Sequence, residues 1–236
     1  VTVAAGAPNA DATITPIGPF CNNSSPTTLT AATGGGAFSG TGVSGNTFSP
    51  ATAGSGTHVI TYSISSVCGD TDTVSIVVNA VPDATINPAA SLCTASSPAT
   101  LSAATSGGTW SGTGVSGNSF NPSVSGAGTF TVTYNITVSG CSSSDTESIT
   151  VNQSLNADIS PAGPFCVTSM PINLSAVSSG GIWSGNGIIN SSSGTFDPSV
   201  SGAGSHIITY SINSACGDTD MVTVSVSAVT IDSDTV

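Results

Sequence analysis

Residues 36–45 read GAFSGTGVSG, and within them Gly40, Gly42 and Gly45 have the spacing G-x-G-x-x-G. Between a strand and a helix, this spacing lets the backbone approach the pyrophosphate of a dinucleotide. The next five residues are NTFSP, in which Phe48 and Pro50 suit a strand and a turn. The stretch therefore lacks the helix that a dinucleotide site needs.

The same stretch returns twice, after Trp110 and after Trp183, and its third copy, SGNGIIN, has lost the last glycine. A recurring aromatic residue followed by glycines is typical of a packed side chain and a tight bend. We interpret the motif in this way and expect no cofactor.

The two histidines, His58 and His206, stand among many serines and aspartates and could take part in acid–base catalysis. Phe130 occupies the same place in the middle copy, so this position accepts an apolar ring. No G-x-S-x-G motif in a strand-turn-helix setting accompanies them. We expect both histidines to pack at the start of a strand, and we expect no catalytic residues and no enzyme activity.

Two acidic residues spaced by two lie near the start of the last strand of each copy. Single aspartates, Asp11, Asp83 and Asp158, recur at the junctions between copies. Ca²⁺ takes 6 to 8 oxygen ligands, so these carboxylates are the candidate metal ligands. The alternative is an acidic rim that keeps the protein dissolved. The candidates for Ca²⁺ are Asp70, Asp72, Asp145, Glu147, Asp218 and Asp220.

The chain of 236 residues has 12 acidic residues and no lysine or arginine, which gives a net charge of −12. Lys and Arg supply most of the affinity for nucleic acid and for anionic membranes, so both partners are excluded. No apolar run approaches the ~20 residues of a membrane span. The apolar content of 38% lies in alternating runs, which predicts a folded chain.

Three copies of one module fill most of the sequence. Corresponding residues recur at intervals of about 72 residues: Cys21, Cys93 and Cys166; Leu29, Leu101 and Leu174; Phe38, Trp110 and Trp183; Tyr62, Tyr134 and Tyr210. We name residues 10–81, 82–156 and 157–229 repeats 1, 2 and 3. Residues 1–9 are expected to end a preceding repeat, and residues 230–236 to begin another module or a linker, in a longer array.

Within each repeat the apolar pattern has a period of two, as in THVITYSI at 57–64. Six or seven short strands with frequent turns predict an all-β fold of three tandem immunoglobulin-like antiparallel β-sandwich repeats. The junctions, such as NAVPD at 79–83, are short, which predicts a semi-rigid rod whose repeats contact their neighbours.

Each repeat contains two cysteines, and an even number at recurring positions predicts one disulfide inside each repeat. Such a bond would stabilise a small module by ~4 kcal/mol and would indicate an extracellular protein. Metal binding by two isolated thiols is the weaker alternative. The expected pairs are Cys21 with Cys68, Cys93 with Cys141, and Cys166 with Cys216.

The pattern FC…LTAA…GG.WSGTGVSG..F.P…GAGT…ITY resembles the tandem Ig-like repeats of giant surface proteins from Bacteroidota, including gliding-motility adhesins exported by type IX secretion. The most specific pieces are Trp110-Ser111-Gly112, Phe120-Asn121-Pro122 and Gly126-Ala127-Gly128-Thr129. The resemblance implies a stalk or filament of a secreted, surface-attached bacterial adhesin.

Two other functions stay open at this stage. Copies of the chain could associate into a homo-oligomeric extracellular filament or hook-like appendage, using unpaired strand edges as contacts. A carbohydrate-binding Ig-like module would instead need an exposed tryptophan, and we expect Trp110 and Trp183 to be buried.

Overall fold

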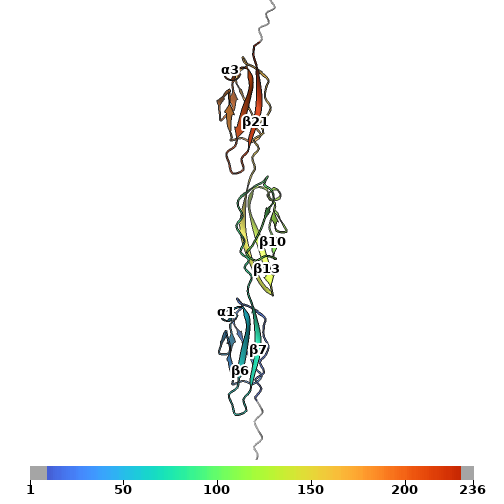
Figure 1. Cartoon of the computed structure of the whole chain (residues 1–236), viewed down its shortest axis with the longest axis vertical. Helices are drawn as coiled ribbons and strands as arrows, with labels where there is room; N and C mark the ends of the chain where they lie inside the picture. Colours follow the sequence, from blue (N-terminus) through green and yellow to red (C-terminus); the bar gives the residue numbers. More distant parts are fainter. Residues whose placement is uncertain (1–9, 230–236) are drawn as a thin grey trace, which may run out of the picture. The chain divides into compact units, whose positions relative to one another are not determined.

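The computed structural model describes residues 10–229, and the expectations for residues 1–9 and 230–236 lie outside this range. The described chain is all-β apart from three helices of one turn, and each repeat has a four-stranded and a three-stranded sheet (Figure 1). The prediction of tandem Ig-like β-sandwiches is confirmed. Among the helices of residues 10–229, none is long and apolar enough to cross a membrane.

Repeat 1 forms sheets with the strand orders β1-β7-β6-β3 and β2-β5-β4. Its elements are β1 (Phe20–Cys21), β2 (Thr27–Thr28), β3 (Ala37–Ser39), β4 (Val43–Ser44), β5 (Thr47–Phe48), α1 (Pro50–Ala53), β6 (Gly56–Ser63) and β7 (Thr71–Asn79).

Repeat 2 has the strand orders β10-β13-β14-β8 and β11-β12-β9. Its elements are β8 (Leu92–Cys93), β9 (Ala99–Thr100), β10 (Thr109–Ser111), β11 (Val115–Ser116), β12 (Ser119–Phe120), α2 (Pro122–Ser125), β13 (Gly128–Val138) and β14 (Cys141–Asn152).

Repeat 3 has the strand orders β15-β21-β20-β17 and β16-β19-β18. Its elements are β15 (Phe165–Cys166), β16 (Ile172–Asn173), β17 (Ile182–Gly185), β18 (Ile188–Asn190), β19 (Thr195–Phe196), α3 (Pro198–Ser201), β20 (Gly204–Ser211) and β21 (Thr219–Ser227).

The alternation in THVITYSI places one face of β6 in the core of repeat 1. Ile60 and Tyr62 are buried, whereas Val59 between them is 58% exposed. Ile60 packs with Phe48 and Ile76 of the same repeat. Burial of such side chains contributes about 1.5–3 kcal/mol each, which offsets part of the entropy lost on folding.

One strand pair in each repeat is parallel. β1 pairs with the end of β7, so that Phe20 lies opposite Val78 and Cys21 lies opposite Asn79. β8 and β15 pair in the same way with the ends of β14 and β21. The other pairs described in these four-stranded sheets are antiparallel, as the sequence predicts. The parallel pair brings the first cysteine of each repeat to the end of its last strand.

Two compact units divide the chain, and each unit takes in part of repeat 2. The first consists of Val1–Pro88, Thr100–Asn118 and Val132–Glu147. The second consists of Ala89–Ala99, Ser119–Thr131 and Ser148–Val236. Repeat 1 and the turn that begins β14 therefore belong to one unit, and repeat 3 and β8 belong to the other.

Candidate functional site at the repeat joints

The two cysteines of each repeat lie at opposite ends of its last strand. In repeat 1, Cys21 is opposite Asn79 at the end of β7, whereas Cys68 lies three residues before Thr71, where β7 begins. At ~3.4 Å per residue, such a strand spans about 30 Å. A disulfide needs Cα atoms about 4.4–6.8 Å apart, so a bond within the repeat is geometrically impossible.

The disulfides instead join neighbouring repeats. Cys21 is bonded to Cys141 and Cys93 is bonded to Cys216, each with a Cα–Cα distance of 5.6 Å. Cys68 and Cys166 are free and exposed. The predicted pairs were therefore wrong: Cys21 does not bond Cys68, Cys93 does not bond Cys141, and Cys166 does not bond Cys216. The even count was right as a sign of disulfides but did not identify the partner.

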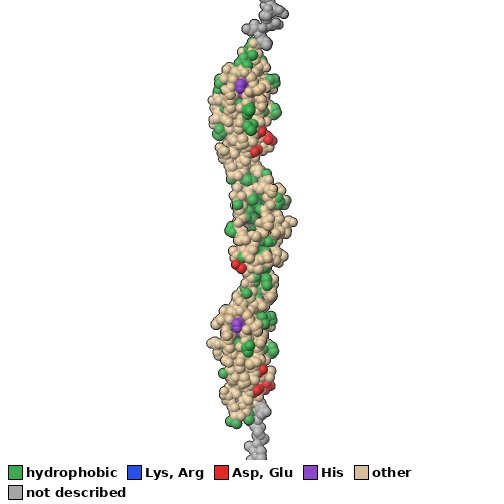
Figure 2. Space-filling view, viewed as in Figure 1, with side chains coloured by type: hydrophobic (Ala, Val, Ile, Leu, Met, Phe, Trp, Pro, Cys, Tyr) green, Lys and Arg blue, Asp and Glu red, His purple; other side chains and the backbone are tan. Residues whose placement is uncertain are grey.

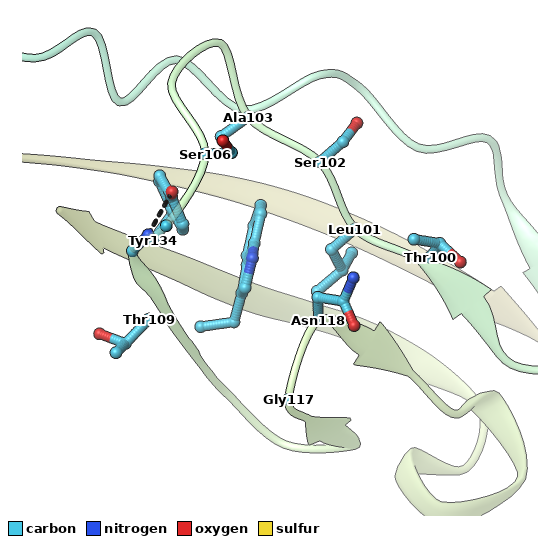
Figure 3. A pocket seen from close by; sticks show the side chains of 12 residues that line it. Thr100, Leu101, Ser102, Ala103, Ser106, Thr109, Gly117, Asn118 and Tyr134 are labelled. Carbon is cyan, nitrogen blue, oxygen red and sulfur yellow. Dashed lines mark hydrogen bonds between the residues drawn. The ribbon is translucent and has the colours of Figure 1, made fainter.

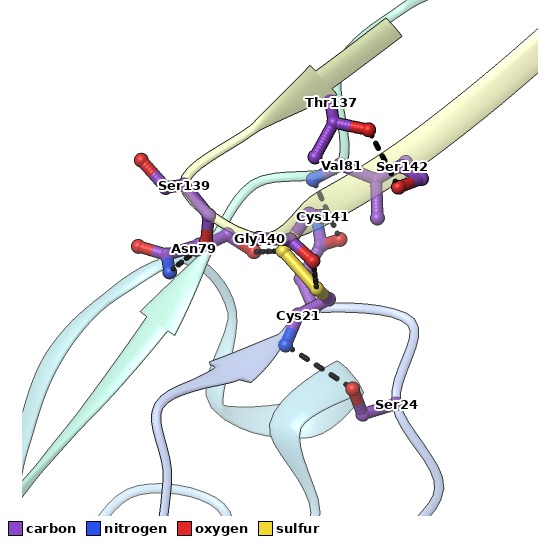
Figure 4. The surroundings of a disulfide bond; sticks show 10 residues. Cys21, Ser24, Asn79, Val81, Thr137, Ser139, Gly140, Cys141 and Ser142 are labelled. Atoms are coloured by element: carbon purple, nitrogen blue, oxygen red, sulfur yellow. Dashed lines mark hydrogen bonds between the residues drawn. A yellow bond between two sulfur atoms is a disulfide. The ribbon is translucent and has the colours of Figure 1, made fainter. Parts of the chain in front are cut away.

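The first joint connects the end of repeat 1 to the turn that begins β14 (Figure 4). Besides the disulfide, the side-chain amide of Asn79 donates a hydrogen bond to the carbonyl of Ser139 at 2.9 Å. Asn22 accepts a bond from the backbone N–H of Val81 at 3.2 Å, which holds the linker against repeat 1. The joint thus combines one covalent bond with polar contacts on both sides of it.

The second joint has the same bond but different polar contacts. The backbone N–H of Leu155 donates to the carbonyl of Cys216 at 3.0 Å. Two hydrogen bonds join residues 94–95 to Ser154. The N–H of Ala95 donates to Ser154 Oγ, and the N–H of Ser154 donates to Thr94 Oγ1, both at 2.9 Å. The linker is therefore tied to both of the repeats that it connects.

The turn that carries the second cysteine has two forms. In repeat 2 it is a tight hairpin, in which Ser139 has φ 49° and Gly140 has φ 80°. In repeats 1 and 3 it is a longer loop, at 64–70 and 212–218. Both forms bring the second cysteine to the edge of its repeat. Cys141, in the hairpin, and Cys216, in a longer loop, are each bonded to the preceding repeat.

The acidic pairs of repeats 1 and 3 accept hydrogen bonds from the backbone. In repeat 1, Asp70 and Asp72 accept hydrogen bonds from the N–H groups of Ala12 and Ile14, both at 2.9 Å. Asp218 and Asp220 do the same for Ala157 and Ile159 in repeat 3. Each carboxylate pair therefore fastens the first segment of its repeat to the last strand.

Repeat 2 departs from this pattern, and the sequence pairing of Asp145 with Glu147 was in the wrong register. Asp145 accepts from the N–H of Ile86 at 2.9 Å and so corresponds to Asp72 and Asp220. Buried Ile149 of repeat 2 corresponds to buried Ile76 of repeat 1. Glu147, two residues before Ile149, therefore corresponds to Val74 and not to an aspartate. Within residues 10–229, no group of three or more acidic, His or Cys side chains is placed to hold a metal ion.

The junction aspartates form local turns. Hydrogen bonds from the Thr13 side chain and then its backbone N–H lower the pKa of Asp11, and those from Thr85 lower the pKa of Asp83 in the same way. The pKa of Asp218 is lowered by the backbone N–H groups of Ala157 and Thr219. Asp158 instead bonds the side chain of Asn156 at 3.0 Å.

The glycine motif is a bend between β3 and β4. Gly40 has φ 142° and Gly42 has φ 82°, and a Cβ on Gly42 would lie 2.6 Å from the Cβ of Ala53. α1, which follows β5, has a single turn, begun by Pro50 and capped by Ser49. Neither feature is the strand-to-helix start of a dinucleotide site.

The histidine rings bind backbone carbonyls near the start of a strand. Nε2 of His58 lies 2.9 Å from the carbonyl of Gly54, and Nε2 of His206 lies 2.8 Å from that of Gly202. The His58 ring also lies near Phe48, with centroids 6.3 Å apart. These are the packing positions that the sequence predicts.

A pocket of about 580 Å³ opens beside Trp110 in repeat 2 (Figure 3). Its lining is neutral and includes Leu101, Ser106, Thr109, Asn118 and Tyr134. The Tyr134 hydroxyl accepts from the N–H of Gly108 and donates to the carbonyl of Thr105, both at 2.7 Å, which fixes the ring.

The two tryptophans differ in exposure, and the expectation that both are buried was wrong for one of them. Trp110 is half-buried and lines the pocket, whereas Trp183 is 5% exposed. Residues 191–194 make the turn between β18 and β19 longer than the two-residue turn between β11 and β12 of repeat 2. A Cβ on Gly194 would lie 2.7 Å from the Trp183 ring, so this longer turn covers that ring. In repeat 3 the longer turn therefore covers the ring whose counterpart in repeat 2 lines the pocket.

The visible surface is largely polar and uncharged, with small acidic clusters and scattered apolar side chains (Figure 2). The exposed apolar residues include Val59, Val124 and Ile207. Such a surface suits contacts through hydrogen bonds more than contacts through ion pairs.

Comparison with known proteins gives only coarse likenesses. No family model matches the chain, and the comparison with curated proteins also finds no match. Three similar solved structures are domains 3–5 of Drosophila OTK (13% identity; 97% of this chain and 100% of that chain; TM-score 0.39), the I-band fragment I67–I69 of titin (11%; 87% and 87%; 0.38) and EC1-3 of mouse protocadherin-24 (9%; 89% and 96%; 0.36). Scores this low carry no argument, so the fold assignment depends on the sheets described above.

Proposed function

We propose that the chain is a structural segment of an extracellular adhesion-type protein, in which disulfides tie each repeat to the next. The observation that carries this proposal is the pair of inter-repeat bonds, Cys21–Cys141 and Cys93–Cys216. A disulfide inside a module stabilises that module. A bond between modules lets a pulling force pass from one module to the next without stretching the linker. Disulfides persist in oxidising compartments, which supports an extracellular location.

The resemblance in sequence supports the finer form of the proposal: a stalk of a large surface-attached bacterial adhesin. The absence of Lys and Arg supports a role without nucleic acid or anionic membrane as partner. Antibodies against the chain are expected to label intact source cells. Labelling that appears only after permeabilisation would overturn the surface location.

Force spectroscopy tests the load-bearing role. With both bonds intact, tension passes from Cys21 to Cys141, along residues 93–141 to Cys93, and then to Cys216. The remaining residues between Cys21 and Cys216 lie outside this shortest path and stay slack. At about 3.5 Å per residue, the intact chain then extends to roughly two-fifths of the length of the reduced chain.

The control is the same molecule pulled after the thiols have been reduced and alkylated. Equal maximum lengths before and after reduction would show that the bonds do not carry the load, and the proposal would fail. A variant with Cys68→Ser serves as the matched control, because Cys68 is free and exposed. It is expected to extend as the parent chain does.

The pocket of repeat 2 favours a second candidate function, the binding of a neutral saccharide. A half-buried tryptophan beside hydroxyl and amide side chains presents an apolar face and hydrogen-bonding groups, and no charged residue lines the pocket. In a Trp183→Phe variant Trp110 is the one tryptophan left, so its fluorescence reports on the pocket. A shift with neutral oligosaccharides that is lost when the lining residue Asn118 is changed to Ala in the same background supports this function. No shift at millimolar concentrations across a panel of them would exclude it.

A further inference from the structure

The two disulfides follow one rule of pairing. A first cysteine, at the end of the first strand of a repeat, bonds the second cysteine of the next repeat. Under this rule Cys166 needs a second cysteine beyond repeat 3, and Cys68 needs a first cysteine before repeat 1. The structure describes all six cysteines, and these two are the free ones, both exposed.

Cys166 has the local structure of a first cysteine that is already bonded. Its N–H donates to Ser169 Oγ at 3.1 Å, as Cys21 does to Ser24 at 3.1 Å. It lies opposite Ser227 at the end of β21, as Cys21 lies opposite Asn79. The half of the joint that repeat 3 would supply is therefore already formed.

Cys68 likewise has the local structure of a bonded second cysteine. The loops 64–70 and 212–218 share two backbone hydrogen bonds: the N–H of Ile64 donates to Asp70 at 2.9 Å, and that of Gly69 to Ser66 at 3.0 Å. The corresponding bonds of the second loop join Ile212 to Asp218 and Gly217 to Ser214. Bonded Cys216 is 8% exposed, whereas Cys68 is exposed, as expected for an unfilled joint.

We propose that Cys166 and Cys68 are the open halves of further inter-repeat joints, and that a second copy of this chain fills them head to tail through a disulfide between Cys166 of one copy and Cys68 of the other. The inference deepens the proposed function and rests on it. Because the two half-joints are different surfaces, the contact is heterologous, and repetition adds copies in a row. The same half-joints would accept a further repeat of the same polypeptide, since the chemistry is the same.

The reaction is thiol–disulfide exchange with a small-molecule disulfide such as oxidised glutathione. The Cys166 thiolate attacks one sulfur of the glutathione disulfide, forms a mixed disulfide and releases one glutathione thiolate. The Cys68 thiolate of the second copy then attacks the Cys166 sulfur and releases the other. Two protein thiols are oxidised, and one glutathione disulfide is reduced to two glutathione thiols.

The test uses the purified 236-residue chain, incubated with oxidised glutathione and separated without reductant. The expected product is a ladder of oligomers whose linked peptide, after chymotryptic digestion, contains Cys68 and Cys166. Cys68→Ser and Cys166→Ser variants each lose the ladder. A mixture of the two variants forms a dimer at least ~10 times faster than either variant alone, because only the mixture offers both half-joints.

The inference would be overturned if each single variant formed dimers as fast as the mixture does. Exposed thiols would then pair whether they are first or second cysteines of their repeats. A chain that stays monomeric would overturn it as well. Peptide mapping of Cys21–Cys141 and Cys93–Cys216 in the same samples keeps the outcomes apart. If these bonds are present but no mixed dimer forms, the head-to-tail inference fails and the proposed function stands. In a tandem fusion of two copies the half-joints meet at a high effective concentration, so failure of Cys166 of the first copy to bond Cys68 of the second would also overturn the inference.

Discussion

Cys21 is covalently bonded to Cys141, which lies 120 residues further along the chain and in the next repeat. The bond crosses a joint at which Asn79 and Ser139 also share a hydrogen bond. Neighbouring repeats are thus connected twice, once through the linker and once through sulfur.

The disulfide arrangement predicts which cysteines react in the folded protein. Alkylation of the monomeric chain without reductant is expected to modify two residues, Cys68 and Cys166, because both thiols are exposed. Mass spectrometry of the digested product checks the positions. Modification of Cys21 or Cys216 without reductant would contradict the arrangement.

Removing the first bond is expected to destabilise the protein strongly. Cys141→Ser opens a loop of 120 residues, which in the chain-entropy model lowers the free energy of unfolding by about 4–5 kcal/mol. Chemical denaturation measures the change. Cys68→Ser is the control and should stay within about 0.5 kcal/mol of the parent, since surface changes have small effects.

The carboxylate of Asp72 is expected to stabilise repeat 1 through its bond to Ile14. Asp72→Ala leaves the partly buried N–H of Ile14 without its acceptor and should cost about 1–3 kcal/mol. Asp72→Asn retains an acceptor oxygen and should cost less. Equal losses for the two variants in thermal unfolding would show that charge, and not the hydrogen bond, matters at this position.

The glycines of the bend are not equivalent. Gly42→Ala puts a methyl group against Ala53 at a positive φ, so we expect it to lower the free energy of unfolding by about 2 kcal/mol or more. Gly45 has φ 56° and nothing within 4 Å, so Gly45→Ala should cost about 1 kcal/mol. Comparison of the two denaturation curves checks this order, and a larger loss at Gly45 would contradict it.

Stability is expected to fall in acid. Hydrogen bonds from the Thr13, Thr85 and Ser199 side chains lower the pKa values of Asp11, Asp83 and Asp197 from 3.8. A lowered pKa contributes stability that is fully present above the unfolded value and is lost as the pH falls through the folded value. The contribution of these groups to the thermal midpoint should be independent of pH above pH ~5, and the midpoint should decrease below pH ~4. A Thr85→Val variant should show a smaller decrease than the parent.

The fold could be predicted from the sequence because the alternation in strands such as β6 and the recurrence of Tyr62, Tyr134 and Tyr210 are local patterns. The cysteine partners could not, since they depend on which end of the repeat each cysteine reaches. The missed signal was the length of the last strand: Cys68 precedes nine strand residues, and Cys21 pairs with the ninth. The sequence pairing of Asp145 with Glu147 was two residues out of register with the aspartate pairs of repeats 1 and 3. The exposure of Trp110 was missed because the turn that covers Trp183 is longer in repeat 3 than in repeat 2.

The loops closed by the two disulfides overlap between residues 93 and 141. Every peptide bond from Cys21 to Cys216 therefore lies inside at least one closed ring. A protease that cuts the chain once anywhere in this range leaves two fragments that remain one molecule. For a protein exposed to digestive enzymes outside a cell, one cut in this range would then not release the part of the chain beyond the cut.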